Sequence, residues 1–353
     1  MKKNILPLLL CALLVAVSIC AMDEGTGVII GTGSDIPSLL FSQWSDTFAK
    51  NAGTNIDYIP LGPLPALVQL KAKTVDFCVT CTPLDADKLD EYGLVQFPLV
   101  GTTIVPVVNL EGIDTGGLRL SGGLLADIFA GRITMWNDER IIALNTGISI
   151  PPVPIRVVYR SDESGSTLFF SRYLSSVSPQ WNNTVGYGTT VAWPVGVGVV
   201  SNEDIIDNVQ RMEGSVGYLP LAYAKHSKLA IAIYDNQDEQ VTNLLNESST
   251  QTGWDITAEY DNDPGAENNW PITGVLFVQL HRKYHDISCA RSMLGFFGWC
   301  YRDAHHRAQL SGYIPVPLPL VKRIETICST IVGMDNVPVW QIPDTDRILR
   351  TNK

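Results

Sequence analysis

The chain has 353 residues, of which 45% are hydrophobic and 17% charged, enough for one large domain or two ordinary ones. Its 36 acidic residues outnumber 25 basic ones, and the net charge of −11 with no basic stripe argues against nucleic acid as a partner. An acidic protein can still bind a small anion, because backbone N–H groups and a single arginine act locally.

Residues 1–21 predict a secretory signal peptide. Lys2 and Lys3 precede the apolar run "ILPLLLCALLVAV", and small residues follow in "SICA". An uncleaved membrane anchor is the alternative, which the shortness of the run disfavours. Cys20 follows a large residue, which argues against a lipoprotein. Loss of the two lysines leaves 23 basic against 36 acidic residues, a net charge of −13. We expect a secreted protein, periplasmic in a bacterium and extracellular or in the secretory pathway in a eukaryote.

The stretch "IIGTGSDIPSLLFSQW" at residues 29–44 predicts a strand, a glycine turn and a helix. Pro37 suits the first turn of a helix whose apolar positions are Leu40, Phe41, Trp44 and Phe48. Such a turn points backbone N–H groups at one spot and attracts an anion. Asp35 nevertheless places a negative charge at the mouth of this turn.

Strand-like and helix-like segments alternate along the rest of the chain, which predicts an α/β protein. We expect strands within 54–61, 75–81, 94–110, 155–160, 214–220 and 270–280. We expect helices within 64–72, in two pieces of 121–145, at 167–177, from 221 onward and across 289–309. The long run 94–110 is typical of a central strand that also links two lobes, and 235–269 reads as an exposed connection.

Residues 155–174 repeat the order of strand, Gly/Ser turn and helix seen at 29–44. Each turn would aim the N–H groups of a helix N-terminus at one point. One such turn in each lobe predicts a cleft that closes around one small ligand.

The cysteines do not predict a redox centre. Five lie in the mature chain, Cys78, Cys81, Cys289, Cys300 and Cys328, so at least one is free or pairs between chains. "CVTC" has CxxC spacing, but it lies in a segment that reads as a buried strand. The sequons at Asn182 and Asn246 matter only if a eukaryotic secretory pathway makes the protein.

The sequence offers no convincing catalytic or metal site. There is no GxSxG motif, and Ser164 has no histidine near it in the sequence. His281 and His285 have i, i+4 spacing, and His305 and His306 are adjacent, but no cysteine or carboxylate completes a ligand set. We therefore predict neither a metal nor an enzymatic activity.

Seven segments in chain order carry a resemblance to a known family: "GTGSDIPSLLFSQWSDTF", "TVDFCVTCTPLDADKLDEYGLVQFPLV", "ADIFAGRITMWNDERIIALN", "VVYRSDESGSTLFFSRYL", "WNNTVGYGTTVAWPVGVG", "EGSVGYLPLAYAK" and "NNWPITGVLFVQLH". On these residues essentially the whole mature chain resembles the periplasmic phosphate-binding, PBP-like family of bacterial phosphate ABC transporters. The resemblance implies a type II periplasmic-binding-protein fold, two α/β lobes joined by a two-strand hinge with the ligand cleft between them. Lobe I would comprise 22–104 plus 273–353, and lobe II 105–272.

The resemblance also implies a function. Members bind dehydrated inorganic phosphate for uptake or sensing and use no cofactor, and any transport would need a permease and an ATPase in separate chains. Their ligands are donors from both lobes and one carboxylate acceptor. An ionised carboxylate only accepts hydrogen bonds, so it favours an anion with a protonated oxygen. Phosphate has one at neutral pH and sulfate does not, so the acceptor discriminates between them.

The second-lobe half of the family's site is matched residue by residue. Arg160 matches the anion-pairing arginine, whose fork of N–H groups suits two oxygens at once. Asp162 matches the carboxylate that orients it. Ser164, Gly165 and Ser166 match the Ser-Gly-Thr turn, with a hydroxyl kept at Ser166.

The first-lobe half departs from the family. Asp35 and Ile36 stand where members have Thr-Phe, so a carboxylate replaces a hydroxyl while the N–H of Ile36 remains. Pro63 replaces a serine and lacks both hydroxyl and N–H. Cys81 stands where the acceptor aspartate belongs.

Two interpretations of Asp35 follow. Either Asp35 is a relocated acceptor for a protonated oxyanion, or it caps its own helix, occupies the anion site and pairs with Arg160 when the lobes close. The first predicts a phosphate or related oxyanion binder. The second favours the alternative function, a ligand-free or altered-ligand paralogue with an extracellular structural or interaction role.

Overall fold

The structure, a computed structural model, describes residues 28–235 and 271–340. The signal-peptide prediction, most of the 235–269 connection and Asn246 lie outside these residues. Within them, ten strands form one sheet with the path β2-β1-β3-β11-β4-β8-β6-β7, and β9 and β13 pair with β4. The strands on this path are β1 (Ile29–Gly33), β2 (Ile56–Pro60), β3 (Phe77–Thr80), β4 (Leu94–Asn109), β6 (Arg156–Arg160), β7 (Val197–Val199), β8 (Ser215–Pro220) and β11 (Thr273–His281).

Short strands and twelve helices complete the described part of the fold. The remaining strands are β5 (Arg119–Leu120), β9 (Ala230–Ile231), β10 (Ile233–Tyr234), β12 (Lys283–Tyr284), β13 (Tyr313–Ile314) and β14 (Val332–Gly333). The helices are α1 (Ser38–Ala52), α2 (Pro63–Lys71), α3 (Ala86–Tyr92), α4 (Gly122–Phe129), α5 (Glu139–Leu144), α6 (Gly165–Val177), α7 (Pro179–Thr184), α8 (Asn202–Arg211), α9 (Leu221–Ser227), α11 (Ile287–Arg302), α12 (His305–Leu310) and α13 (Leu318–Cys328).

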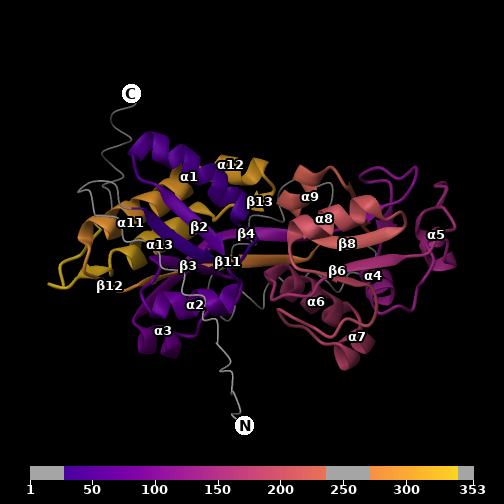
Figure 1. The fold of residues 1–353 in the computed structure, drawn as a ribbon, viewed down its shortest axis with the longest axis horizontal. Coiled ribbons are helices and arrows are strands. Elements are labelled where there is room, and N and C mark those ends of the chain that lie inside the picture. Colours follow the sequence, from indigo (N-terminus) through magenta and orange to yellow (C-terminus); the bar gives the residue numbers. More distant parts are fainter. Residues whose placement is uncertain (1–27, 236–270, 341–353) are drawn as a thin grey trace, which may run out of the picture.

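The elements gather into two halves, which β4 and β11 join (Figure 1). One half holds β1–β3 with α1–α3 and α11–α13, and the other holds β6–β8 with α4–α9. We call them the first and the second lobe. Together they form two mixed α/β lobes joined by two strands, the architecture that the resemblance to the type II periplasmic-binding proteins implies. Where the chain crosses between lobes, the N–H of Ile104 donates to the carbonyl of Ile272 at 2.7 Å. The lobe boundaries after residues 104 and 272 stay a prediction.

The amphipathic pattern of the first long helix is confirmed. Leu40, Phe41, Trp44 and Phe48 are the buried residues of α1, as their spacing predicts. The ring of Phe41 stacks on Tyr58 of β2 with centroids 4.2 Å apart. In the second lobe Phe170 of α6 stacks on Tyr218 of β8 at 4.4 Å. These ring pairs fix the helix that follows each turn against its sheet.

The single helix expected across 289–309 is wrong. Helix α11 ends at Arg302 and α12 begins at His305. The carbonyl of Trp299 accepts from the N–H groups of both Asp303 and Ala304, so the regular hydrogen-bond series stops there. The side chain of Ala304 is fully buried, so a tertiary contact rather than a local signal explains the break.

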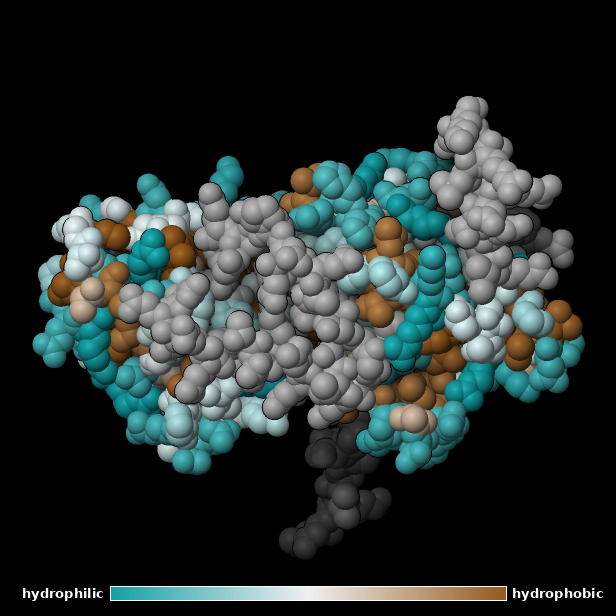
Figure 2. Space-filling model, turned by 180° about the vertical axis from the view of Figure 1, so that it is seen from behind, coloured by the Kyte–Doolittle hydropathy of each residue, from teal (hydrophilic) through white to brown (hydrophobic). Residues whose placement is uncertain are grey.

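The described residues contain no membrane-spanning helix and no disulfide bond. No helix in the described residues is long and apolar enough to cross a bilayer. On the face shown in Figure 2, hydrophilic side chains cover much of the described surface of both lobes, with hydrophobic ones in smaller groups between them. All five cysteines among the described residues are free thiols, and Cys78 of β3 and Cys81, which follows the end of β3, are both buried.

Candidate anion-binding site

The first-lobe turn lies between β1 and α1. Gly33 has φ +142°, and a Cβ there would lie 2.0 Å from the carbonyl oxygen of Val79. Only glycine therefore lets β1 pass so close to β3. The next N–H, that of Ser34, donates to the same carbonyl at 2.9 Å, and the N–H of Ile36 donates to Ser34 Oγ at 3.3 Å.

Three tyrosine hydroxyls hold this turn by its carbonyl groups. Tyr58 of β2 donates to the carbonyl of Ser34 at 2.6 Å, and Tyr313 of β13 to that of Ile36 at 2.8 Å. Tyr223 of α9, in the second lobe, donates to the carbonyl of Asp35 at 3.1 Å. This arrangement could not be predicted from the sequence, because the three tyrosines come from distant elements.

The second-lobe turn lies between β6 and α6. Arg160 is the last residue of β6, and its side chain is only 3% exposed. Asp162 accepts from Arg160 Nε and Nη2 at 2.6 Å each, which is the two-point pairing expected of a carboxylate that orients the guanidinium. The structure thus brings Asp162 and Arg160 together, and their role toward an anion stays a prediction.

Helix α6 begins directly after this pair. Ser164 is its N-cap, and its Oγ accepts from the N–H of Ser166 at 3.2 Å. Gly165 and Ser166 are fully or nearly fully buried in the first turn. Ser166 Oγ has no hydrogen-bond partner among the described residues. A buried hydroxyl without a partner is costly in a fold, and here it lies at the positive end of a helix.

The two turns meet across the lobes. Arg160 Nη1 donates to Asp35 Oδ2 at 2.5 Å, and the Asp35 side chain is 21% exposed. Asn202, the first residue of α8, joins both groups: its Oδ1 accepts from Arg160 Nη1 and its Nδ2 donates to Asp35 Oδ2, each at 3.0 Å. Burial would lower the pKa of Arg160, but its hydrogen bonds and charge pairing with Asp162 and Asp35 outweigh burial and raise it.

The expectation that Asp35 could cap its own helix is wrong. Pro37 occupies the N-cap position of α1, and no side chain accepts a capping hydrogen bond there. The Asp35 carboxylate instead accepts a hydrogen bond from Arg160. The pairing with Arg160, the other half of that interpretation, is present.

The two remaining substituted positions also lie where the lobes touch. Pro63 is the first residue of α2, and Glu163 of the second lobe accepts a hydrogen bond from the backbone of Leu64 beside it. A Cβ on Gly165 would lie 3.1 Å from the Sγ of Cys81. Burial raises the pKa of the Cys81 thiol to about 11, so it stays a neutral thiol near pH 7 and cannot replace a carboxylate acceptor.

The histidines show no metal site. His281 Nε2 lies 2.7 Å from the carbonyl oxygen of Leu70, and burial lowers the pKa of the ring. Across residues 28–235 and 271–340, no group of three or more histidine, cysteine, aspartate or glutamate side chains could hold a metal.

Sequence reasoning missed Asn202 and Tyr223. They lie 167 and 188 residues from Asp35 along the chain. Tyr223 belongs to the segment "EGSVGYLPLAYAK", which carries the family resemblance but no expected ligand role, and Asn202 belongs to none of the seven segments. Nothing in the local pattern signals them, because their contact with Asp35 exists only once the lobes are together.

Comparison with known proteins places this geometry in context. Residues 21–304 match the model of the PBP superfamily domain. The phosphate-binding protein PstS of Xylella fastidiosa strain Temecula1 is 40% identical over 304 residues, which cover 84% of each chain. PstS of Pasteurella multocida strain Pm70 is 34% identical over 341 residues, 94% of this chain and 99% of that one. Among solved structures, the phosphate-bound periplasmic phosphate-binding protein PfluDING is 18% identical with a TM-score of 0.63, covering 86% of this chain and 99% of that one, and shows the shared fold.

Proposed function

Because the chain belongs to the PBP superfamily, and within it to the family of the phosphate-binding protein PstS, we propose that it is a solute-binding protein for inorganic phosphate or a related tetrahedral oxyanion. In this proposal the anion binds between the lobes. Its proposed ligands from the second lobe are Arg160, Ser164, Gly165 and Ser166, and those from the first lobe are Ile36 and Asp35.

One observation carries the proposal most strongly. Within residues 28–235 and 271–340, Ser166 Oγ has no hydrogen-bond partner although it is buried in the first turn of α6, close in sequence to an arginine that is itself almost fully buried. An oxyanion would accept from that hydroxyl, from the helix N-terminus and from Arg160 together. The helix dipole adds to the attraction, since partial positive charge gathers at its N-terminus.

The same geometry supports Asp35 as the acceptor. Arg160 and Asn202 both donate to its Oδ2. An ionised carboxylate oriented in this way can accept from a protonated ligand oxygen through Oδ1. Sulfate, which has no such proton, would meet an uncompensated repulsion.

Titration calorimetry with phosphate, arsenate and sulfate tests the function. We expect phosphate binding in the micromolar range or tighter, and a loss of about two orders of magnitude or more in Arg160→Ala, which removes a buried charged donor and leaves Asp35 and Asp162 without their cation. Arg140→Ala is the matched control, because Arg140 belongs to the same lobe and also pairs with aspartates but is half exposed. Absence of heat with every oxyanion would overturn the proposal and favour the structural or interaction role.

The variant Asp35→Thr distinguishes an Asp35 that accepts a hydrogen bond from the ligand from one that occupies the anion site. If Asp35 accepts the ligand proton, the variant binds phosphate about tenfold more weakly and loses its preference over sulfate. If Asp35 instead occupies the place of the anion on Arg160, the variant binds phosphate more tightly than the wild type. Threonine restores the hydroxyl that the family carries at this position.

The family also supports a cellular role. We propose that the protein is secreted, in the periplasm if its source is a bacterium, and hands its ligand to a membrane permease with an ATPase, both in separate chains. Its relatives are binding proteins, so we propose no enzymatic activity. The signal peptide at 1–21, lobe I at 22–104 plus 273–353 and lobe II at 105–272 are part of this proposal.

A further inference from the structure

Three side chains of the second lobe, from three different elements, converge on one residue of the first. Arg160 of β6 and Asn202 of α8 both bond to Asp35 Oδ2, and Tyr223 of α9 bonds to the carbonyl of Asp35. Arg160 already has a place in the proposed anion site. Asn202 and Tyr223 have none, although both are buried and both cross between the lobes.

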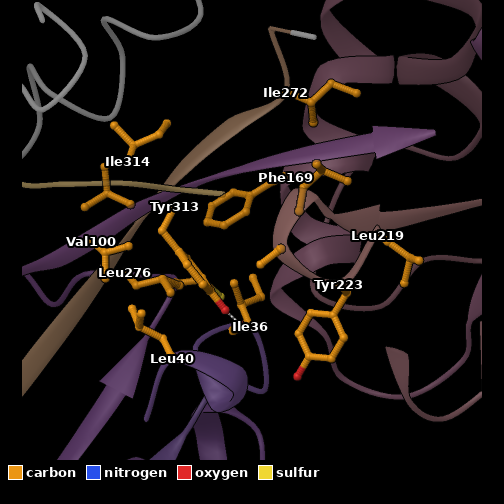
Figure 3. Close-up of a cluster of buried hydrophobic side chains, with 14 of the residues drawn as sticks. Ile36, Leu40, Val100, Phe169, Leu219, Tyr223, Ile272, Leu276, Tyr313 and Ile314 are labelled. Atoms are coloured by element: carbon orange, nitrogen blue, oxygen red, sulfur yellow. Dashed lines mark hydrogen bonds between the residues drawn. The ribbon is translucent and has the colours of Figure 1, made fainter. Parts of the chain in front are cut away.

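The hydroxyl of Tyr223, a residue of the second lobe, contacts the backbone of the first lobe. Its ring packs at the edge of a buried apolar cluster that includes Ile36 and Leu219, and its hydroxyl points away from the cluster carbons (Figure 3). The ring is only 3% exposed, and burial raises the pKa of the phenol, so the group remains a hydrogen-bond donor. The carbonyl that it contacts also accepts from the N–H of Ser38 at 3.1 Å, at the start of α1. The hydroxyl therefore ties α9 to the backbone of the turn that leads into α1.

Asn202 bonds to both members of the ion pair at once. Its carbonyl oxygen accepts from the guanidinium, and its amide nitrogen donates to the carboxylate. Only this orientation of the amide matches a donor on one side and an acceptor on the other. The side chain is 1% exposed, at the start of α8 directly after the N-cap Ser201. It thus holds Arg160 and Asp35 in register without carrying a charge itself.

We propose that Asn202 and Tyr223 are positioning residues which hold Asp35, and with it the first-lobe turn, against the second lobe, and so set how slowly the closed cleft releases its anion. The inference rests on the proposed function. Both hydrogen bonds must break before the lobes can separate, whereas neither is needed for the anion to meet Arg160 in an open cleft. Their loss therefore acts on the dissociation rate and leaves the association rate nearly unchanged.

Hydroxyl deletions at three tyrosines give a matched test. Tyr58, Tyr223 and Tyr313 donate to the carbonyls of three consecutive residues, but only Tyr223 belongs to the other lobe. In stopped-flow measurements we expect Tyr223→Phe to release phosphate about three- to tenfold faster than the wild type, the factor that one net hydrogen bond supports. Tyr313→Phe, with the same atom removed inside the first lobe, should stay within about twofold. Equal rates for the two variants would overturn the proposal.

A second measurement does not depend on ligand. Spin labels at Lys88→Cys and Arg211→Cys, exposed positions in the first and second lobe, report the distance between the lobes. We expect Asn202→Leu combined with Tyr223→Phe to broaden and lengthen this distance distribution in phosphate-free protein, while Tyr58→Phe leaves it unchanged. If the wild type binds no oxyanion, the proposed function fails, but this comparison still decides the role of the two residues. An unchanged distribution in the double variant contradicts it.

Discussion

The hydroxyl of Ser166 should contribute to phosphate affinity but not to the stability of the fold. Its Oγ is buried without a hydrogen-bond partner among the described residues, so the folded chain gains little from it. We expect Ser166→Ala to leave the midpoint of thermal unfolding unchanged or slightly raised, because the variant removes an uncompensated polar group. The same variant should bind phosphate about tenfold more weakly, since a donor to the anion is lost. Calorimetry and thermal unfolding of one preparation give both quantities.

Ser171 of the same helix is the control for Ser166. It is also fully buried, but its Oγ accepts from the N–H of Gly188 at 3.2 Å. Ser171→Ala should therefore lower the free energy of unfolding by about 1 kcal/mol and leave phosphate affinity unchanged. The opposite pattern in the two variants would contradict a ligand role for Ser166.

Residues close in sequence were predictable, and residues brought together only by the fold were not. Arg160 and Asp162 are two positions apart at the end of a strand, so their pairing could be expected from the sequence. The contact of Asp35 with Arg160 was one of two interpretations, because Asp35 lies in the other lobe. Asn202 and Tyr223 gave no signal, since each reaches Asp35 only through the packing of its helix on the sheet.

The start of α6 packs closely against the first-lobe turn. A Cβ on Gly165 would lie 3.0 Å from Ile36 Cδ1 and 3.1 Å from Cys81 Sγ, both in the first lobe. We expect Gly165→Ala to push the start of α6 away from this turn and to weaken phosphate binding about tenfold. Alanine also favours helix over glycine, so the free energy of unfolding should not fall. Affinity by calorimetry and stability by urea unfolding check the two expectations.

Gly295 in α11 supplies the control for Gly165. Nothing lies within 4 Å of a Cβ added there. Gly295→Ala should raise the stability through helix propensity and leave the affinity as it is. A Gly165→Ala variant with wild-type affinity would show that the lobes tolerate the added methyl group.

The ends and faces of helices were likewise predictable where local sequence determines them, and not where tertiary packing does. The burial of Leu40, Phe41, Trp44 and Phe48 in α1 was predictable, because a helix with that spacing has one apolar face. The end of α11 at Arg302 was not, because the apolar pattern continues through the buried Ala304. A continuous pattern cannot show that the chain changes direction while it remains in the core.

Across the whole molecule, five thiols stay free although the protein is proposed to be secreted. The odd number of cysteines after the expected signal peptide predicted that at least one is free or pairs between chains, and the structure leaves all five free. Burial raises the pKa of Cys78 to about 12 and that of Cys81 to about 11, from an ordinary value of 9.0. The pKa values of Cys289, Cys300 and Cys328 are raised as well, and burial is the main cause in each case.

These shifts predict that the fold loses stability at alkaline pH. Below pH 9 the thiols are protonated in both the folded and the unfolded chain, so their contribution is fully present. Between pH 9 and about 11 to 12 the unfolded thiols ionise while the buried ones do not, which increasingly favours unfolding as the pH rises. Urea unfolding from pH 7 to 10.5 should show a plateau to about pH 8.5 and a steep fall above it. A free energy of unfolding that stays level to pH 10.5 would mean that water reaches these thiols in the folded protein.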